Sequence, residues 1–296
     1  MMGFCGMLCG MFYFPSPDTP ALMLVYLLFS MMFGACVGSF LNVCIYRIPR
    51  ELSVVRPRSF CPACNTPIPG WQNIPLLSWV LLGGKCGRCR ARISIRYFVV
   101  EALTAILFGL VLLQWNALPE FLGLVAKTGW CLPVYMVFAA SLVCASAIDM
   151  EHYILPDRIT IGGTVAGLAL SPLLPELHDT AVWHQALLRS AVGAGCGFGG
   201  LFLISLIGRW VYKKDAMGFG DVKLMAMFGA FFGWQALPFV LFIGALTGSI
   251  GGVVMTLARR RNEEGIIPFG PFLCLGALVW LFWGPALCDM YLRLFR

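Results

Sequence analysis

The chain has 296 residues, of which 59% are hydrophobic and only 12% charged, and its mean hydropathy is +0.84. This composition excludes a disordered chain, a secreted disulfide scaffold and a soluble nucleic-acid-binding protein, although the formal net charge of +7 alone would permit the last. We therefore expect an all-α, polytopic integral membrane protein.

The first apolar run, 21–46, follows an N-terminal segment, 1–20, that indicates no function. No Lys or Arg precedes Arg47, so the run lacks the basic region of a cleavable signal peptide, and we predict that it stays as the first membrane span. Later apolar stretches of a length close to the ~20 residues that cross a bilayer predict further spans at about 97–113, 130–148, 159–174, 191–208, 222–235, 237–257 and 268–287. The expectation is about eight transmembrane helices, although 222–235 is short for a full crossing.

The basic residues predict the orientation. With the N-terminus outside, all but four of the 21 Lys and Arg residues lie on the cytoplasmic side, the exceptions being Lys127, Arg189, Arg293 and Arg296. The anionic lipid of that face accounts for the net charge, so membrane lipid is an expected partner and nucleic acid is not. The loop 47–96 is then cytoplasmic, and 97–296 forms the rest of the helical membrane domain.

Glycine pairs spaced four apart recur within the predicted spans. They are Gly34/Gly38, Gly163/Gly167, Gly193/Gly197, Gly229/Gly233 and Gly248/Gly252. Because two small residues on one helix face let backbones approach closely, these pairs predict helix packing.

Four of the 13 cysteines stand apart in the cytoplasmic loop. They form two CxxC motifs, Cys61/Cys64 and Cys86/Cys89, separated by 21 residues. Two such turns supply the four sulfurs of a tetrahedral zinc site, so we predict a structural Zn²⁺ that folds the loop between spans one and two. Disulfide exchange is the alternative, but the predicted topology puts these thiols in the reducing cytosol.

Two aspartates are predicted at the same cytoplasmic depth. Asp149 ends the span at 130–148, and Asp221 opens the span at 222–235, after the glycines Gly218 and Gly220. Two carboxylates at close range could share a proton, activate a water and protonate a leaving amine, and glycines beside them would let an extended substrate approach.

A plainer interpretation stays open for the same region. Asp221 and Asp157 could be helix caps and Asp149 a solvated boundary residue. Lys223 could orient Asp221 or extend to lipid headgroups.

The motifs together carry a family resemblance that spans about residues 34 to 275. They are the stretch Gly38 to Pro49, the two CxxC motifs, Asn73-Ile-Pro75, Ile93 to Tyr97, Leu155-Pro156-Asp157, Gly218-Phe-Gly220-Asp221-Val-Lys223 and Pro268-Phe-Gly270-Pro271. The chain resembles the type IV prepilin peptidases, the bifunctional leader peptidases and N-methyltransferases of bacterial type IV pilus and type II secretion systems. Phe219 departs mildly from the Tyr that is commoner in this GxGD motif.

The resemblance implies a membrane aspartic endopeptidase of the GxGD class, with Asp149 and Asp221 as its catalytic pair. Such enzymes cleave type IV prepilins and type II secretion pseudopilins after a glycine at the cytoplasmic face of the bacterial inner membrane. They then methylate the new N-terminal residue with S-adenosylmethionine. No nucleotide-binding fingerprint is evident in the sequence, so the residues that would bind this donor are not predicted.

Two alternatives belong to other classes. A membrane thiol oxidoreductase would depend on the CxxC motifs and tolerate Asp221→Asn. A non-catalytic pilus or secretion assembly factor would use the aspartates as caps and the zinc loop to dock a partner.

Overall fold

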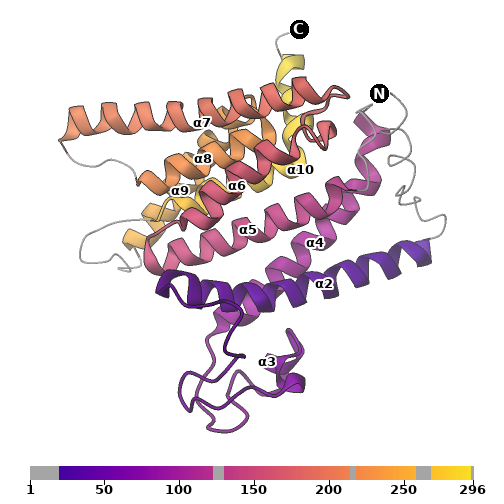
Figure 1. Cartoon of the computed structure of the whole chain (residues 1–296), viewed down its shortest axis with the longest axis vertical. Coiled ribbons are helices and arrows are strands. Elements are labelled where there is room, and N and C mark those ends of the chain that lie inside the picture. The colour runs from indigo at the N-terminus through magenta and orange to yellow at the C-terminus, as the bar shows by residue number, and fades with distance from the viewer. Residues whose placement is uncertain (1–19, 123–129, 214–217, 258–267, 295–296) are drawn as a thin grey trace. The chain divides into compact units, whose positions relative to one another are not determined.

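The computed structural model describes residues 20–122, 130–213, 218–257 and 268–294, and every long element in them is an α-helix (Figure 1). The predicted N-terminal segment 1–20 lies outside the described residues except for Pro20. The chain divides into two units. The N-terminal unit comprises Phe14–Asn116 and Leu132–Ile148, and the C-terminal unit comprises Asp149–Arg296 with Met1–Tyr13 and Ala117–Cys131.

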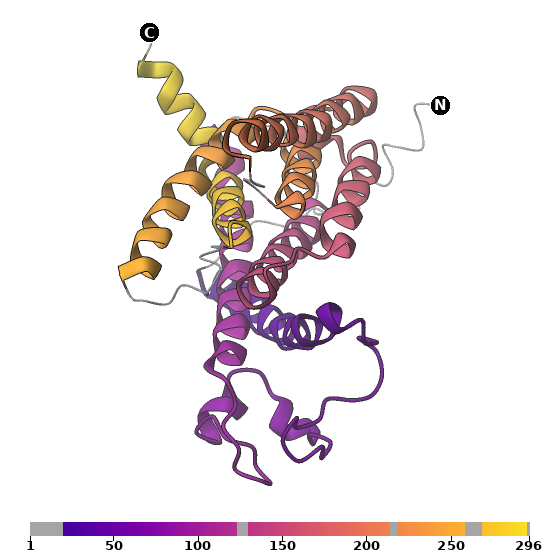
Figure 2. The same ribbon diagram turned by 90° about the vertical axis from the view of Figure 1, so that its left-hand side faces the viewer.

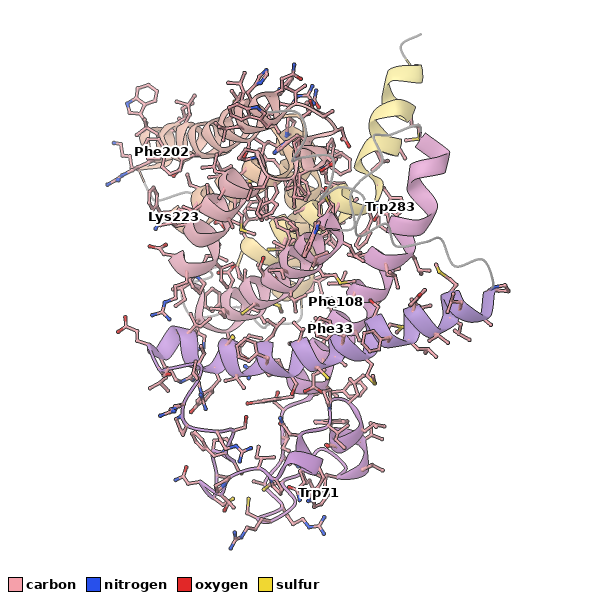
Figure 3. All side chains as sticks on the ribbon, turned by 45° about the vertical axis from the view of Figure 1, so that its right-hand side comes forward. Phe33, Trp71, Phe108, Phe202, Lys223 and Trp283 are labelled. Atoms are coloured by element: carbon pink, nitrogen blue, oxygen red, sulfur yellow. The ribbon has the colours of Figure 1, made fainter. Side chains whose placement is uncertain are left out.

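The N-terminal unit is built on helices α2 (Pro20–Arg47), α4 (Ile95–Leu122) and most of α5 (Cys131–His152). Helices α2 and α4 approach closely, because a Cβ at Gly34 would lie 2.9 Å from Ala105 Cα and one at Gly38 would lie 2.7 Å from Glu101 Cα. Beside this crossing the rings of Phe33 and Phe108 meet, with centroids 6.0 Å apart (Figure 3). The predicted packing role of the first glycine pair is confirmed.

The loop between α2 and α4 contains only short elements, namely η1 (Ile48–Arg50), η2 (Gly70–Asn73) and α3 (Leu77–Leu81). Its first part is fixed by Arg47, which is buried at the end of α2. The Arg47 guanidinium donates to the carbonyls of Ser53 at 2.9 Å and Pro57 at 2.7 Å. These bonds hold the chain as it leaves the helix.

The C-terminal unit is organised around α8 (Phe219–Phe232), in which every residue from Asp221 to Phe231 except Lys223 is buried. Helix α8 contacts α6 (Asp157–Leu170), α7 (Trp183–Tyr212), α9 (Ala236–Leu257) and α10 (Gly270–Leu294), as Figure 2 shows, and also η3 (Pro175–His178). An apolar helix that is covered on all sides can keep a charged side chain away from lipid, so Asp221 is placed where the unit is best packed.

Glycines set the approach of two helices to α8. A Cβ at Gly193 or Gly197 of α7 would collide with the backbone of Gly229 or Met225, respectively. On α6, Gly167 packs against α8, because a Cβ at this position would lie 2.9 Å from the Cβ of Ala230. The predicted packing role of these glycines is confirmed.

Each of the eight predicted spans overlaps one α-helix. Among the described residues, five helices are long and apolar enough to cross a membrane: Pro20–Arg50, Ile95–Gln114, Cys131–His152, Trp183–Val211 and Ala236–Val254. Gly270–Gly284 is a shorter apolar helix, and α6 and α8 have 14 residues each. The all-helical membrane architecture is confirmed, whereas the count of eight crossings stays a prediction.

Candidate active site and metal centre

The two CxxC motifs fold into matching turns. Residues flanking each motif form an isolated antiparallel bridge, Phe60 with Pro67 and Lys85 with Arg92. In the first turn Cys61 N–H donates to Thr66 at 3.0 Å, and in the second Cys86 N–H donates to Ala91 at 2.8 Å. The residue after each second cysteine takes a positive φ, 52° at Asn65 and 60° at Arg90, which closes the turn.

The four sulfurs converge. The Sγ atoms of Cys61, Cys64, Cys86 and Cys89 all lie within 4.8 Å of one another, and those of Cys61 and Cys89 are 3.8 Å apart. Sulfurs bound to one tetrahedral Zn²⁺ at about 2.3 Å are themselves about 3.8 Å apart, so the donor set fits such an ion. The predicted cysteines thus form one cluster that could hold a metal ion.

Hydrogen bonds within the turns favour the thiolate form at two of the four cysteines, Cys64 and Cys86, whereas burial and the neighbouring sulfurs raise the pKa of Cys89 to about 11. The Thr66 side chain and backbone lower the pKa of the Cys64 thiol to about 6. The pKa of the Cys86 thiol is also below its usual value, because the backbone N–H groups of Cys89 and Arg88 donate to the sulfur. Thiolates are the form of cysteine that binds metal.

Asp149 lies in the last turn of α5, the part of that helix that belongs to the C-terminal unit. The helix ends at His152. Tyr153 then takes a left-handed conformation, and its N–H donates to the Asp149 carbonyl. The Asp149 side chain is 6% exposed, and its Oδ2 accepts the backbone N–H of Gly270 at 3.0 Å. Asp149 is therefore a buried, oriented carboxylate, and it is not a solvated boundary residue.

Asp221 lies in the first turn of α8 and is 7% exposed. The N-cap of this helix is Gly218, without a side-chain capping bond, so Asp221 is not the N-cap residue. Its carboxylate is close enough to that of Asp149 for the two to interact electrostatically. The structure thus brings together the two aspartates that the sequence singled out.

Leu155 fills the space between the segments that carry these groups. A Cβ at Gly220 would lie 2.9 Å from Leu155 Cβ, and one at Gly270 would lie 3.2 Å from Leu155 Cδ2 and 2.6 Å from Asp149 Oδ2. Glycine at 220 and 270 therefore lets α8, α10 and the α5–α6 connection meet around Leu155. The sequence motifs include Leu155, Gly220 and Gly270, but they do not predict that these residues contact one another.

Lys223 and Asp157 pair with each other. Lys223 Nζ donates to Asp157 Oδ1 at 2.6 Å and lies 5.0 Å from the centre of the Phe219 ring. Asp157 is the first residue of α6, after the N-cap residue Pro156. The pair ties the N-terminus of α6 to α8, two residues beyond Asp221, a role that the sequence could not distinguish from capping and lipid contact.

The Gly270 N–H is the functional group that sequence reasoning missed. It lies 121 positions from Asp149 and is a backbone atom, so no side-chain pattern reveals it. The motif Pro268-Phe-Gly270-Pro271 was the available signal, because a glycine between two prolines indicates a backbone that must approach another group closely.

Two family models match the chain. Residues 32–115 match the Bacterial Peptidase A24 N-terminal domain, and residues 136–253 match the Type IV leader peptidase family. The first match covers the cysteine loop with its flanking helices, and the second covers both aspartates.

Curated relatives are similar over most of their length. The prepilin leader peptidase/N-methyltransferase of Aeromonas salmonicida is 35% identical, over 91% of this chain and 95% of the relative. The protein of the same name from Pseudomonas aeruginosa is 34% identical over 91% of this chain and 94% of the relative. The one from Neisseria gonorrhoeae is 33% identical over 83% of this chain and 86% of the relative. No solved structure matches. The sequence motifs, the paired aspartates and these similarities lead to one conclusion: the chain belongs to the type IV leader peptidase family.

Proposed function

We propose that the chain is a membrane aspartic endopeptidase that removes the leader from type IV prepilins and then methylates the new N-terminal amine. The observation that carries the proposal is the pair of buried carboxylates, Asp149 and Asp221, which interact within one unit of a chain from this family. A carboxylate drawn into a membrane protein costs a few kcal/mol, ~2.5–3.5 on insertion scales, so two together call for a function.

The chemistry follows from two carboxylates that share one proton. The ionised carboxylate takes a proton from water as the oxygen attacks the scissile carbonyl carbon, while the protonated one donates to the carbonyl oxygen. Collapse of the tetrahedral intermediate then passes a proton to the leaving amine. The Gly270 N–H, which donates to Asp149 Oδ2, fixes that carboxylate in one orientation throughout.

We assign the cysteine cluster to a structural Zn²⁺ held by Cys61, Cys64, Cys86 and Cys89. Four sulfur ligands leave no open position for substrate, so the ion would stabilise the loop and take no part in bond cleavage. The thiol oxidoreductase alternative loses support, since the four sulfurs gather as one set within 4.8 Å and not as two separate redox pairs.

The second activity rests on the name of the relatives, prepilin leader peptidase/N-methyltransferase. S-adenosylmethionine, when bound, would supply an electrophilic methyl group, and the substrate amine that accepts it would lose a proton to solvent. The protein's part is to bind the donor and hold the neutral amine against it.

The setting we propose is the bacterial inner membrane, with the active site at its cytoplasmic face. The distribution of basic residues supports this orientation. The substrates are type IV prepilins and type II secretion pseudopilins, cut after glycine, and membrane lipid surrounds the helices.

The test is cleavage of a synthetic prepilin segment, with a basic leader followed by Gly and Phe, by the purified chain in detergent. Mass spectrometry should show a cut after Gly. In Asp149→Asn and in Asp221→Asn the rate should fall by at least about 10³-fold, because one carboxylate cannot perform both proton transfers. Asp157→Asn, a neighbouring carboxylate outside the pair, is the matched control.

Retained cleavage in Asp149→Asn or Asp221→Asn, with thermal unfolding like the wild type, would remove that residue from the pair. An intact peptide with the well-folded wild type would favour the non-catalytic assembly factor.

A further inference from the structure

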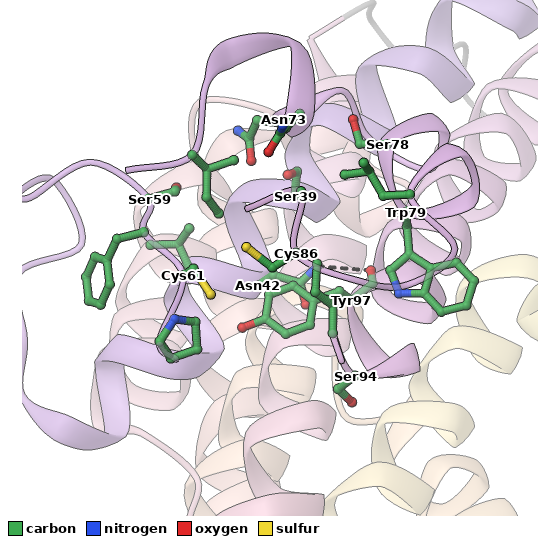
Figure 4. Close-up of a pocket in the computed structure, with 18 of the residues that line it drawn as sticks. Ser39, Asn42, Ser59, Cys61, Asn73, Ser78, Trp79, Cys86, Ser94 and Tyr97 are labelled. Atoms are coloured by element: carbon green, nitrogen blue, oxygen red, sulfur yellow. Dashed lines mark hydrogen bonds between the residues drawn. The ribbon is translucent and has the colours of Figure 1, made fainter. Parts of the chain in front are cut away.

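A cavity of about 380 Å³ lies in the N-terminal unit, between the cytoplasmic ends of α2 and α4 and the loop that joins them (Figure 4). Helix α2 contributes Ser39 and Asn42, helix α4 contributes Tyr97 and Glu101, and the loop contributes Trp79. Cys61 and Cys86 also line it, so the metal cluster borders the cavity. The volume is in the range of sites for small molecules and cofactors.

Glu101 places a carboxylate in this cavity although the residue is only 8% exposed. Its Oε2 accepts the Leu76 N–H at 2.7 Å, and the side chains of Ser39 and Asn42 also donate to it. All three of these donors are neutral, so dipoles stabilise the charged form of this carboxylate. A buried carboxylate of this kind attracts a cationic ligand.

Two buried polar atoms of residues that line the cavity have no hydrogen-bond partner in the part of the chain that the structure describes. They are Asn42 Oδ1, on a side chain that is 2% exposed, and Trp79 Nε1. The other end of the Asn42 amide is fixed, because Nδ2 donates to the Tyr97 carbonyl at 3.0 Å (Figure 4). An unpaired acceptor and an unpaired donor in one cavity are costly unless a polar ligand satisfies them.

The remaining lining suits a flat heterocycle joined to a charged tail. The aromatic rings of Tyr46, Trp79 and Tyr97 line the cavity, and aromatic rings stack on nucleobases. Arg92 lines it too and carries the charge opposite to that of Glu101. The cavity thus offers an aromatic surface, a negative group for a cation and a positive group for a carboxylate.

We propose that this cavity binds S-adenosylmethionine, with Glu101 as the counter-charge to its cationic part and with Asn42 and Trp79 as hydrogen-bonding partners. The ligand combines an adenine ring, a sulfonium and ammonium, and a carboxylate, which matches the three features of the lining. This assignment rests on the methyltransferase half of the proposed function and gives that activity a place separate from Asp149 and Asp221. It also gives the metal cluster a purpose, because the turns that hold Cys61 and Cys86 form part of the wall.

The test measures binding of tritiated S-adenosylmethionine to the purified full-length chain by equilibrium dialysis. Glu101→Gln keeps the shape and an acceptor for the Leu76 N–H, so we expect Kd to rise about tenfold or more with folding retained by circular dichroism. Trp79→Phe removes one donor and keeps an aromatic ring, and its Kd should rise severalfold. The matched controls are Glu51→Gln and Trp71→Phe, on exposed side chains of the same loop that do not line the cavity.

Ultraviolet crosslinking of the same ligand to the wild type gives a second measurement that needs no variant. Peptide mapping should place the label within 39–47, 59–68 or 72–101. Wild-type binding that both Glu101→Gln and Trp79→Phe leave unchanged, or a label within 149–296, would overturn the assignment while the methyltransferase proposal stands. A wild type that cleaves the prepilin segment but neither binds the donor nor methylates the product would remove the methyltransferase half itself, and this assignment with it.

Discussion

The metal cluster and the aspartate pair differ in how the chain assembles them. Cys61 and Cys89 lie 28 positions apart, and each half of the cluster is a four-residue turn closed by its own hydrogen bonds. Asp149 and its partner Gly270 lie 121 positions apart, and Asp221 comes from a third helix. The first site depends mainly on local geometry, whereas the second exists only when several helices pack correctly.

This difference indicates which kinds of substitution would disturb each site. A cysteine substitution would remove a proposed ligand directly, and we expect it to leave the helices of the C-terminal unit unchanged. The aspartate pair can instead be disturbed by residues that carry no chemistry, because glycines and Leu155 determine how closely the helices meet. Four experiments extend the comparison beyond the aspartates themselves.

The largest effect among them is expected from Gly270→Ala. The added Cβ would lie 2.6 Å from Asp149 Oδ2, so the carboxylate or the start of α10 must shift. Misplacing a catalytic group by about 1 Å costs up to about 10²-fold in rate, and we expect a loss of that order in kcat for leader cleavage. Gly162→Ala on α6, where a Cβ meets nothing within 4 Å, is the control. Equal cleavage rates for the two variants would mean that the Gly270 contact is not needed.

Cys86→Ser tests the cysteine cluster, the site that depends on local geometry. Metal bound per chain, measured by mass spectrometry of the purified protein, should fall at least about tenfold, because a hydroxyl is a poor replacement for a thiolate ligand. We expect methylation to suffer more than cleavage, since the cavity wall contains this turn. Cys196→Ser, at an exposed cysteine on α7, is the control. Unchanged metal content would show that Cys86 is not a ligand.

Gly193→Ala tests the packing of α7 on α8. A Cβ here would collide with the Gly229 backbone, and overpacking of this kind destabilises by about 1–3 kcal/mol. We expect a lower midpoint of thermal unfolding and a loss of cleavage at elevated temperature. Gly195→Ala, two residues away on the same helix and facing open space, should behave like the wild type. If the two variants unfold at the same temperature, the close contact is not important for stability.

The smallest effect is expected at the pair of Lys223 and Asp157. The Asp157 side chain is 60% exposed, and exposed ion pairs contribute at most about 1 kcal/mol. A double-mutant cycle with Lys223→Met and Asp157→Asn should give a coupling energy below about 1 kcal/mol in thermal unfolding and a modest change in cleavage. A much larger loss in Lys223→Met than in Asp157→Asn would instead indicate that Lys223 acts directly on Asp221 or on substrate.

Much of the fold and of the two candidate sites could be predicted from the sequence, for physical reasons. The eight helices follow from runs of apolar residues, since a long apolar segment has few stable alternatives to a helix in a membrane. The cysteine cluster follows from two CxxC motifs, because short chain segments limit where the sulfurs can lie. The pairing of Asp149 with Asp221 was predicted from equal depth and family resemblance, and the structure brings the two together.

Other features depend on contacts that no local pattern encodes. The sequence left Asp221 open as a helix cap, whereas the structure assigns that position to Gly218. Only the fold places Glu101 in a cavity that Asn42 and Trp79 also line.

By itself, then, the sequence determined the membrane-protein class, the helices, the four metal-ligand candidates and the two aspartates, because composition, apolar run length and motif spacing act over short stretches of chain. Only the tertiary structure decided that Gly270 orients Asp149, that Lys223 pairs with Asp157 and that a polar cavity adjoins the cysteines. Those contacts join residues far apart in the chain, and their distances depend on how closely whole helices pack.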